Sequence, residues 1–78
     1  MNIFVAKLSP FTTDDDLKDA FSNFGEVDSA KVIMDRDTGR SKCFGFVEMP
    51  DDEDAQAAID ALDGDAFNGA DAIVVKKA

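Results

Sequence analysis

The chain has 78 residues and 45% hydrophobic composition, which suits one globular domain with a small core. No apolar run is long enough to span a membrane, and the single cysteine excludes an internal disulfide. The formal net charge of −9 argues at first sight against a nucleic-acid partner. We expect a single domain over residues 1–78 that is cytoplasmic and does not contact a membrane.

A short β-rich run opens the chain, and an amphipathic helix follows it. We expect the first strand over residues 2–8, with Phe4 out of phase with its aliphatic neighbours. Thr13 is the expected cap of the helix, since acidic residues fill its first turn and suit the helix dipole. Gly25 is expected to end it. The apolar residues of this helix recur at i, i+3, i+4 and i+7: Leu17, Ala20, Phe21 and Phe24.

Two further strands are expected, over residues 27–34 and 42–49, joined by the polar arm 35–41. In the first of them, Ala30 and Val32 should face the core. The second alternates strictly, with Lys42, Phe44, Phe46 and Glu48 on one face and Cys43, Gly45, Val47 and Met49 on the other. Its two phenylalanines thus share a face with charged residues, which is typical of a functional surface.

A second helix and a last strand complete the chain. The acidic run after Pro50 should start the helix, and Gly64 should end it. Its apolar positions repeat the spacing of the first helix: Ala55, Ala58, Ile59 and Leu62. The last strand is expected over residues 72–76, with Ile73 and Val75 toward the core. We expect Phe21, Phe24 and Phe67 in the core or at its margin.

The resulting order β-α-β-β-α-β predicts an α+β, ferredoxin-like fold. Right-handed crossovers give a four-stranded antiparallel sheet with both helices on one face, and strands one and three in the middle. The other face of the sheet stays open to water. The aromatic residues Phe4, Phe44 and Phe46 should converge on its two central strands.

The charges separate between the two sides of this fold. The helical segments 12–28 and 50–65 hold 13 acids and one base, a net charge of −12, and the rest of the chain holds +3. A phosphate backbone could therefore approach the open face, because the acidic side is largely screened beyond about 8 Å at physiological salt. The cations outside the helical segments are Lys7, Lys31, Arg36, Arg40, Lys42, Lys76 and Lys77.

Metal and catalytic sites are less well supported by the residues. The carboxylates of Asp14–Asp16 diverge around a helix, so the helix dipole and solvation explain them better than a metal does. The arm resembles a calcium loop only faintly, because Gly39 comes one place early and Phe46 replaces the bidentate glutamate. Without histidine or a nucleophile–base pair, we expect no catalytic residue, no metal, no cofactor and no enzyme activity.

The chain resembles the RNA recognition motif family over essentially its whole length, and in particular the family's short single-domain bacterial members. Residues 42–49 match the longer ribonucleoprotein motif, with cysteine at position 43 where the family has glycine and Met49 where it has an aromatic residue. Residues 3–8 match the shorter motif, with Lys7 where the family has asparagine. Cys43 and Met49 are expected to pack toward the core.

The resemblance implies that Phe4, Phe44 and Phe46 stack on bases or sugars of single-stranded RNA, with modest affinity and loose sequence preference. Lys42 matches a phosphate-contacting position of the family, whereas the other six cations are assigned from the charge distribution alone. Single-stranded DNA is not distinguished from RNA, and a protein partner on the acidic helices is the alternative. We expect a monomer. Glu48 either discriminates among bases or lies beyond the RNA.

Overall fold

A computed structural model describes residues 1–39, 41–67 and 69–78, and all of their side chains except those of Ser41 and Lys42. The sheet order is β2-β3-β1-β4, and every neighbouring pair is antiparallel. The expected α+β, ferredoxin-like order is therefore confirmed. The elements are β1 (Asn2–Ala6), α1 (Asp14–Ser22), β2 (Ser29–Met34), β3 (Ser41–Glu48), α2 (Asp52–Leu62) and β4 (Val74–Lys77).

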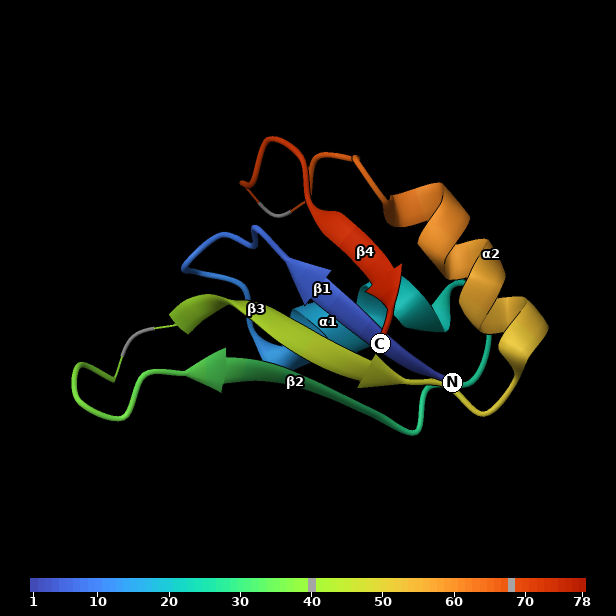
Figure 1. Ribbon diagram of the computed structural model, residues 1–78, viewed down its shortest axis with the longest axis horizontal. Helices are drawn as coiled ribbons and strands as arrows, with labels where there is room; N and C mark the ends of the chain where they lie inside the picture. Colours follow the sequence, from blue (N-terminus) through green and yellow to red (C-terminus); the bar gives the residue numbers. More distant parts are fainter. Residues whose placement is uncertain (40, 68) are drawn as a thin grey trace.

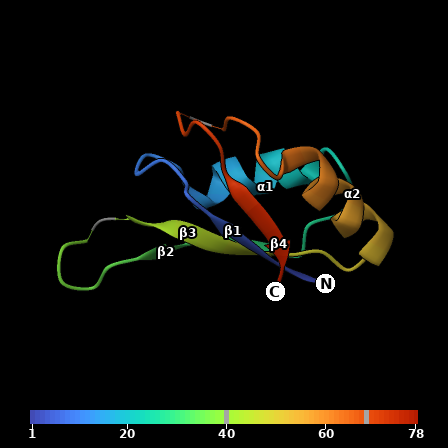
Figure 2. The ribbon, with the colours of Figure 1, turned by 45° about the horizontal axis from the view of Figure 1, so that its top comes forward.

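Both helices lie on one side of the sheet, as Figure 2 shows, and leave its other side open. The central strands are β1 and β3, as expected, while β2 and β4 form the two edges (Figure 1). The two ends of the chain lie close together, since the amide of Ala78 donates to the carbonyl of Asn2 at 2.8 Å. Within the described residues, no helix is long and apolar enough to cross a membrane.

The core lies between the sheet and the helices. Every second residue of the strands points into it and packs against the apolar face of the helices, which together form one apolar layer. Phe24 and Phe67 pack at its margin and Phe21 is fully buried, as expected. The fully buried large side chains are Phe21, Ile3, Leu17, Met49, Ile73, Val5, Val47 and Val75.

Both helices begin as the sequence predicts. The Thr13 hydroxyl accepts from the Asp16 amide at 3.2 Å, and the Asp16 carboxylate accepts from the Thr13 amide at 3.0 Å, which forms a capping box. Helix α1 ends at Ser22, earlier than Gly25, and the Phe24 amide donates to the Phe21 carbonyl at 3.0 Å in a tighter turn after it.

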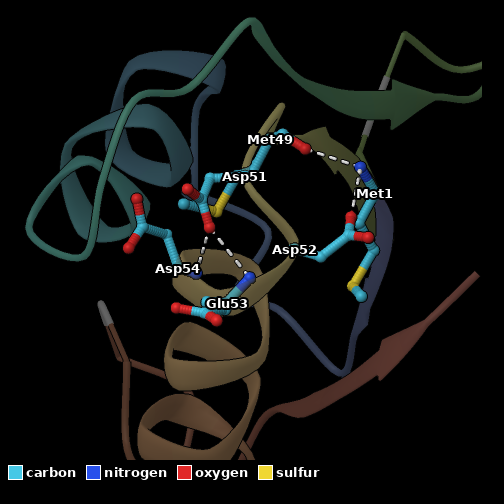
Figure 3. A network of polar contacts seen from close by, with 6 residues as sticks. All are labelled: Met1, Met49, Asp51, Asp52, Glu53 and Asp54. Carbon is cyan, nitrogen blue, oxygen red and sulfur yellow. Dashed lines mark hydrogen bonds and ion pairs between the residues drawn. The ribbon is translucent and has the colours of Figure 1, made fainter.

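The start of α2 is tied to the start of β1 by the contacts drawn in Figure 3. The Asp51 carboxylate caps the helix by accepting from the amides of Glu53 at 2.9 Å and Asp54 at 3.1 Å. The amine of Met1 donates to the Met49 carbonyl at 2.6 Å, and its nitrogen lies 3.6 Å from Asp52 Oδ1. These contacts hold the first strand beside the first turn of the second helix.

Two strands depart from the regular geometry expected for them, at the same end of the sheet. β1 ends at Ala6 instead of residue 8, because Lys7 adopts a left-handed φ of 59°. In β3 the expected alternation holds from Phe44 onward but fails at Cys43, where φ is 64° and the register against β2 shifts. The prediction of strict alternation over residues 42–49 is therefore wrong at Cys43.

The other two strands differ from expectation by about two residues. β2 begins at Ser29 and not at residue 27. β4 begins at Val74 and not at residue 72, because the backbone of Ile73 bonds instead to Gly64 and Asp65 after α2. These differences lie within the usual uncertainty of strand ends.

Each edge strand has an amide that bonds to a carboxylate outside the sheet. The Val32 amide in β2 donates to Asp14 Oδ1 at 2.7 Å, from the first turn of α1. The Val75 amide in β4 donates to Asp63 Oδ1 at 2.9 Å, from the residue after α2. Aspartates at one end of each helix thus satisfy backbone groups that an edge strand would leave unpaired.

Candidate nucleic-acid interface

Three aromatic rings form a cluster on the open side of the sheet. Phe4 lies between the fully buried Ile3 and Val5, so strand alternation turns its ring away from the core. Its ring centroid lies 5.9 Å from that of Phe44 and 5.5 Å from that of Phe46, and the latter two are 6.3 Å apart. Phe46 is 42% exposed, while the other two are half-buried. The expected convergence is confirmed.

Two lysines flank this cluster on the edge strands. The strand register pairs Lys31 with Phe46, Phe46 with Phe4, and Phe4 with Lys76. Directly paired residues in neighbouring strands point to the same side of a sheet. The four side chains therefore form one row across the open face, with two aromatic rings in the middle and an exposed cation at each end.

A second row of polar residues lies beside the first. Glu48 lies two residues after Phe46. It pairs with Ser29 on β2 and with Asn2 on β1, which come two residues before Lys31 and Phe4. The Ser29 hydroxyl lies 3.5 Å from Glu48 Oε2. Together with Lys31 and Phe46 these residues line a shallow hollow of about 290 Å³ at the end of the aromatic row. Glu48 therefore lies next to the cluster and not remote from it.

Glycine at position 45 lets β2 and α1 approach the strand that carries two of the rings. A Cβ atom there would overlap the carbonyl oxygen of Lys31, and it would lie 3.1 Å from both Val32 Cα and Leu17 Cδ1. The nearest atom belongs to the β2 backbone, which is held in the sheet. A side chain at Gly45 would therefore push β2 away from β3.

The structure does not bring every expected cation to this face. Lys77 pairs with the buried Ile3, so alternation places it on the helical side of the sheet, away from the rings. Lys7 lines a hollow between the loop after β1 and residues 69–72. Arg36 is exposed in the turn that the Gly39 amide closes by bonding to the Asp35 carbonyl.

Two of the expected residues cannot be placed against the rings. Arg40 lies outside the described residues. Lys42 belongs to β3, but its side chain lies outside what the structure describes. The cations placed in the aromatic row are thus Lys31 and Lys76.

Two residues beside the rings were missed by sequence reasoning. Asn2 and Ser29 line the hollow with Glu48, and their position two residues before Phe4 and Lys31 would have placed them on the same face. Phe11, in the loop after β1, is 84% exposed and lines the separate hollow beside Lys7. Among the described residues, no group of three or more potential ligands is arranged to hold a metal ion.

The sequence over residues 3–72 matches the RNA recognition motif family. The chain belongs to this family. Two of its three departures from the family's motifs fall on left-handed backbone: Cys43 replaces the glycine of the longer motif, and Lys7 replaces the asparagine of the shorter one. Glycine and asparagine are the residues that tolerate this conformation best. Lys7 and Cys43 are the non-glycine residues with positive φ in the described part of the chain.

Similar family members include plant and bacterial proteins. The mitochondrial glycine-rich RNA-binding protein 2 of Arabidopsis thaliana is 52% identical over 86% of this chain and 42% of its own length. A Nostoc sp. protein that carries the name RNA-binding protein RbpB is 43% identical over 97% of this chain and 74% of its own length. The chain thus spans less than half of the Arabidopsis protein.

A solved structure agrees closely with this fold. The crystal structure of RNA binding protein PG1 superposes with a TM-score of 0.95 and 46% sequence identity. The match covers 100% of this chain and 93% of that one. The family's fold is therefore conserved in a protein of nearly the same extent.

Proposed function

We propose that this chain binds single-stranded RNA on the open face of its sheet. The observation that carries the proposal is the row formed by Lys31, Phe46, Phe4 and Lys76, with Phe44 beside it. Bases stack on Phe4 and Phe46, Phe44 packs against the sugars between them, and the charge of the two lysines attracts the phosphate backbone to the row. The family and the names of its RNA-binding relatives support this choice of ligand.

The expected affinity is modest. Stacking of a base on an aromatic side chain contributes about 1–3 kcal/mol, so two bases supply only a few kcal/mol. The same stacking accepts any base, so most positions of the RNA are read loosely. Uncovered rings on a sheet face also expose apolar area to water, which a stacked base would remove.

The test is binding of short single-stranded RNA to the Phe44→Ala, Phe46→Ala double variant. Removing two of three rings should lower the affinity at least about a hundredfold, as the loss of about 3 kcal/mol implies. Circular dichroism and urea unfolding should show an intact fold, because both rings lie outside the core. Fluorescence anisotropy with a labelled oligonucleotide measures the affinity.

A matched control is Phe11→Ala, which removes an exposed ring in the loop after β1 and not on the sheet. Its RNA affinity should remain that of the parent. If the double variant bound RNA as tightly as the parent protein, the stacking surface would be wrong. Parallel titration with DNA of the same sequence shows whether the 2′-hydroxyl contributes.

A further inference from the structure

Glu48 is an acid beside a surface that we propose to bind a polyanion. It lies two residues beyond Phe46 on β3, about 7 Å along the strand on the same face. A base is wider than a phenyl ring, so a base stacked on Phe46 can extend one edge toward Glu48. A carboxylate at this place repels the phosphates of RNA. It favours binding only if hydrogen-bond donors of the bound base offset that repulsion.

The surroundings of Glu48 suit the edge of one base. The hollow of about 290 Å³ is just smaller than typical small-ligand sites, which begin at about 300 Å³, and so suits part of one base. The polar side chains that line it are the acceptor-only carboxylate of Glu48, the cation of Lys31, the hydroxyl of Ser29 and the amide of Asn2, and Val47 and Ala78 also line it. The Ser29 hydroxyl at 3.5 Å helps to orient the carboxylate.

The four bases differ in what they offer a carboxylate. Guanine has two adjacent donors, N1–H and the N2 amine, on its Watson–Crick edge, with the O6 acceptor next to them. Adenine and cytosine present one amine beside a ring acceptor, and uracil presents one N–H between two oxygens. Only guanine can donate both hydrogen bonds to one carboxylate, while its O6 accepts from a lysine such as Lys31.

We infer that Glu48 selects guanine as the base stacked on Phe46, with Lys31 contacting O6. This inference rests on the proposed RNA-binding function and deepens it. The other bases would leave the carboxylate without its two donors and close to a phosphate chain. Selectivity then arises from one good pairing together with an unfavourable charge against the wrong bases.

The test uses uridine oligonucleotides that carry one variable base, titrated against the parent protein and Glu48→Gln. The parent should bind the guanine oligonucleotide about tenfold more tightly than the others, as expected for a bidentate contact. Glu48→Gln should lower this ratio, because its amide has one acceptor and can therefore take only one of the two guanine donors. Replacing guanine by inosine removes the N2 amine, so it should weaken binding to the parent only.

Glu53→Gln is the matched control, since it removes the same charge from an exposed site on α2. Removing any acid can tighten binding to every oligonucleotide, so the ratio between bases is the quantity to compare. A parent without guanine preference, or an unchanged ratio in Glu48→Gln, would overturn the inference and leave the proposed function standing. Failure of every oligonucleotide to bind would overturn both.

Discussion

Lys7 and Cys43 lie opposite each other at one end of the two central strands, and both have left-handed backbone. Their φ angles are 59° and 64°, and the Leu8 amide next to Lys7 donates to the Cys43 carbonyl at 2.8 Å. A side chain in this conformation costs about 1–2 kcal/mol. The hydrogen bond and the sheet hold both residues there, so the strain is retained in the folded state.

Cys43→Gly should therefore stabilise the protein. Glycine adopts the left-handed conformation freely, and the gain is offset in part by the larger entropy of glycine in the unfolded chain. Cys43→Ala is the control, because it removes the sulfur but keeps the strained Cβ. We expect the glycine variant to exceed the alanine variant by about 1 kcal/mol in the free energy of unfolding, measured with urea. Equal stabilities would show that the backbone carries no strain.

Gly45→Ala should destabilise the fold by about 2 kcal/mol, because the new methyl group overlaps the Lys31 carbonyl and crowds Leu17. Gly39→Ala is the comparison. It measures the cost of a left-handed alanine without a clash, because Gly39 has φ of 70° and no atom lies within 4 Å of the added Cβ. Urea unfolding of both variants measures the difference. The prediction fails if Gly45→Ala costs no more than Gly39→Ala.

Asp14→Ala should lower the free energy of unfolding by about 1–2 kcal/mol. It leaves the part-buried Val32 amide without its acceptor and removes a negative charge from the start of α1. Asp15→Ala, in the same turn and equally exposed, loses only the charge effect and should cost a few tenths of a kcal/mol. Similar losses for the two variants would assign the whole effect to the helix dipole.

RNA affinity should fall only gently with salt. Each phosphate neutralised on a single strand contributes about −0.7 to the slope of log K against log salt, so the two lysines of the row give a slope of about −1.4 at most. Lys76→Gln should make the slope shallower, whereas Lys18→Gln on α1 should leave it unchanged. A steep parent slope would mean that many more cations contact the RNA than the aromatic row contains.

The fold could be predicted because its local patterns agree with one another. The apolar spacing of the helices, the capping sequence at Thr13 and the displaced Phe4 each point to the same order of elements. The three rings could be predicted for the same reason, since alternation alone assigns them to one face. Strand register was then the only further information needed to bring them together.

Other features depend on tertiary structure that no local pattern reveals. The aspartates that bond to the edge strands lie 18 and 12 residues from their partners, Val32 and Val75. The hollow at Glu48 combines side chains from three strands, so it exists only in one register. Left-handed backbone at Lys7 could not be read from lysine itself, which rarely adopts it.

Lys77 shows the limit of grouping charges by segment. The alternation that assigns Ile73 and Val75 to the core also assigns Lys77 to that side, and the structure agrees. We grouped Lys77 with the other cations because it belongs to the last strand, although its side chain lies on the opposite face of the sheet from Lys76. Charge patterns along a strand need to be read at every second residue.

The aspartates beside Val32 and Val75 bear on how the sheet meets other β-strands. A fifth strand approaching β2 or β4 would need the amide that each carboxylate already occupies. Two copies meeting along the same edge would also bring like charges together. The sheet can therefore present a broad uncovered face to a ligand while its two edge strands disfavour pairing with strands of another molecule. Such pairing between molecules is the first step toward fibrous aggregates.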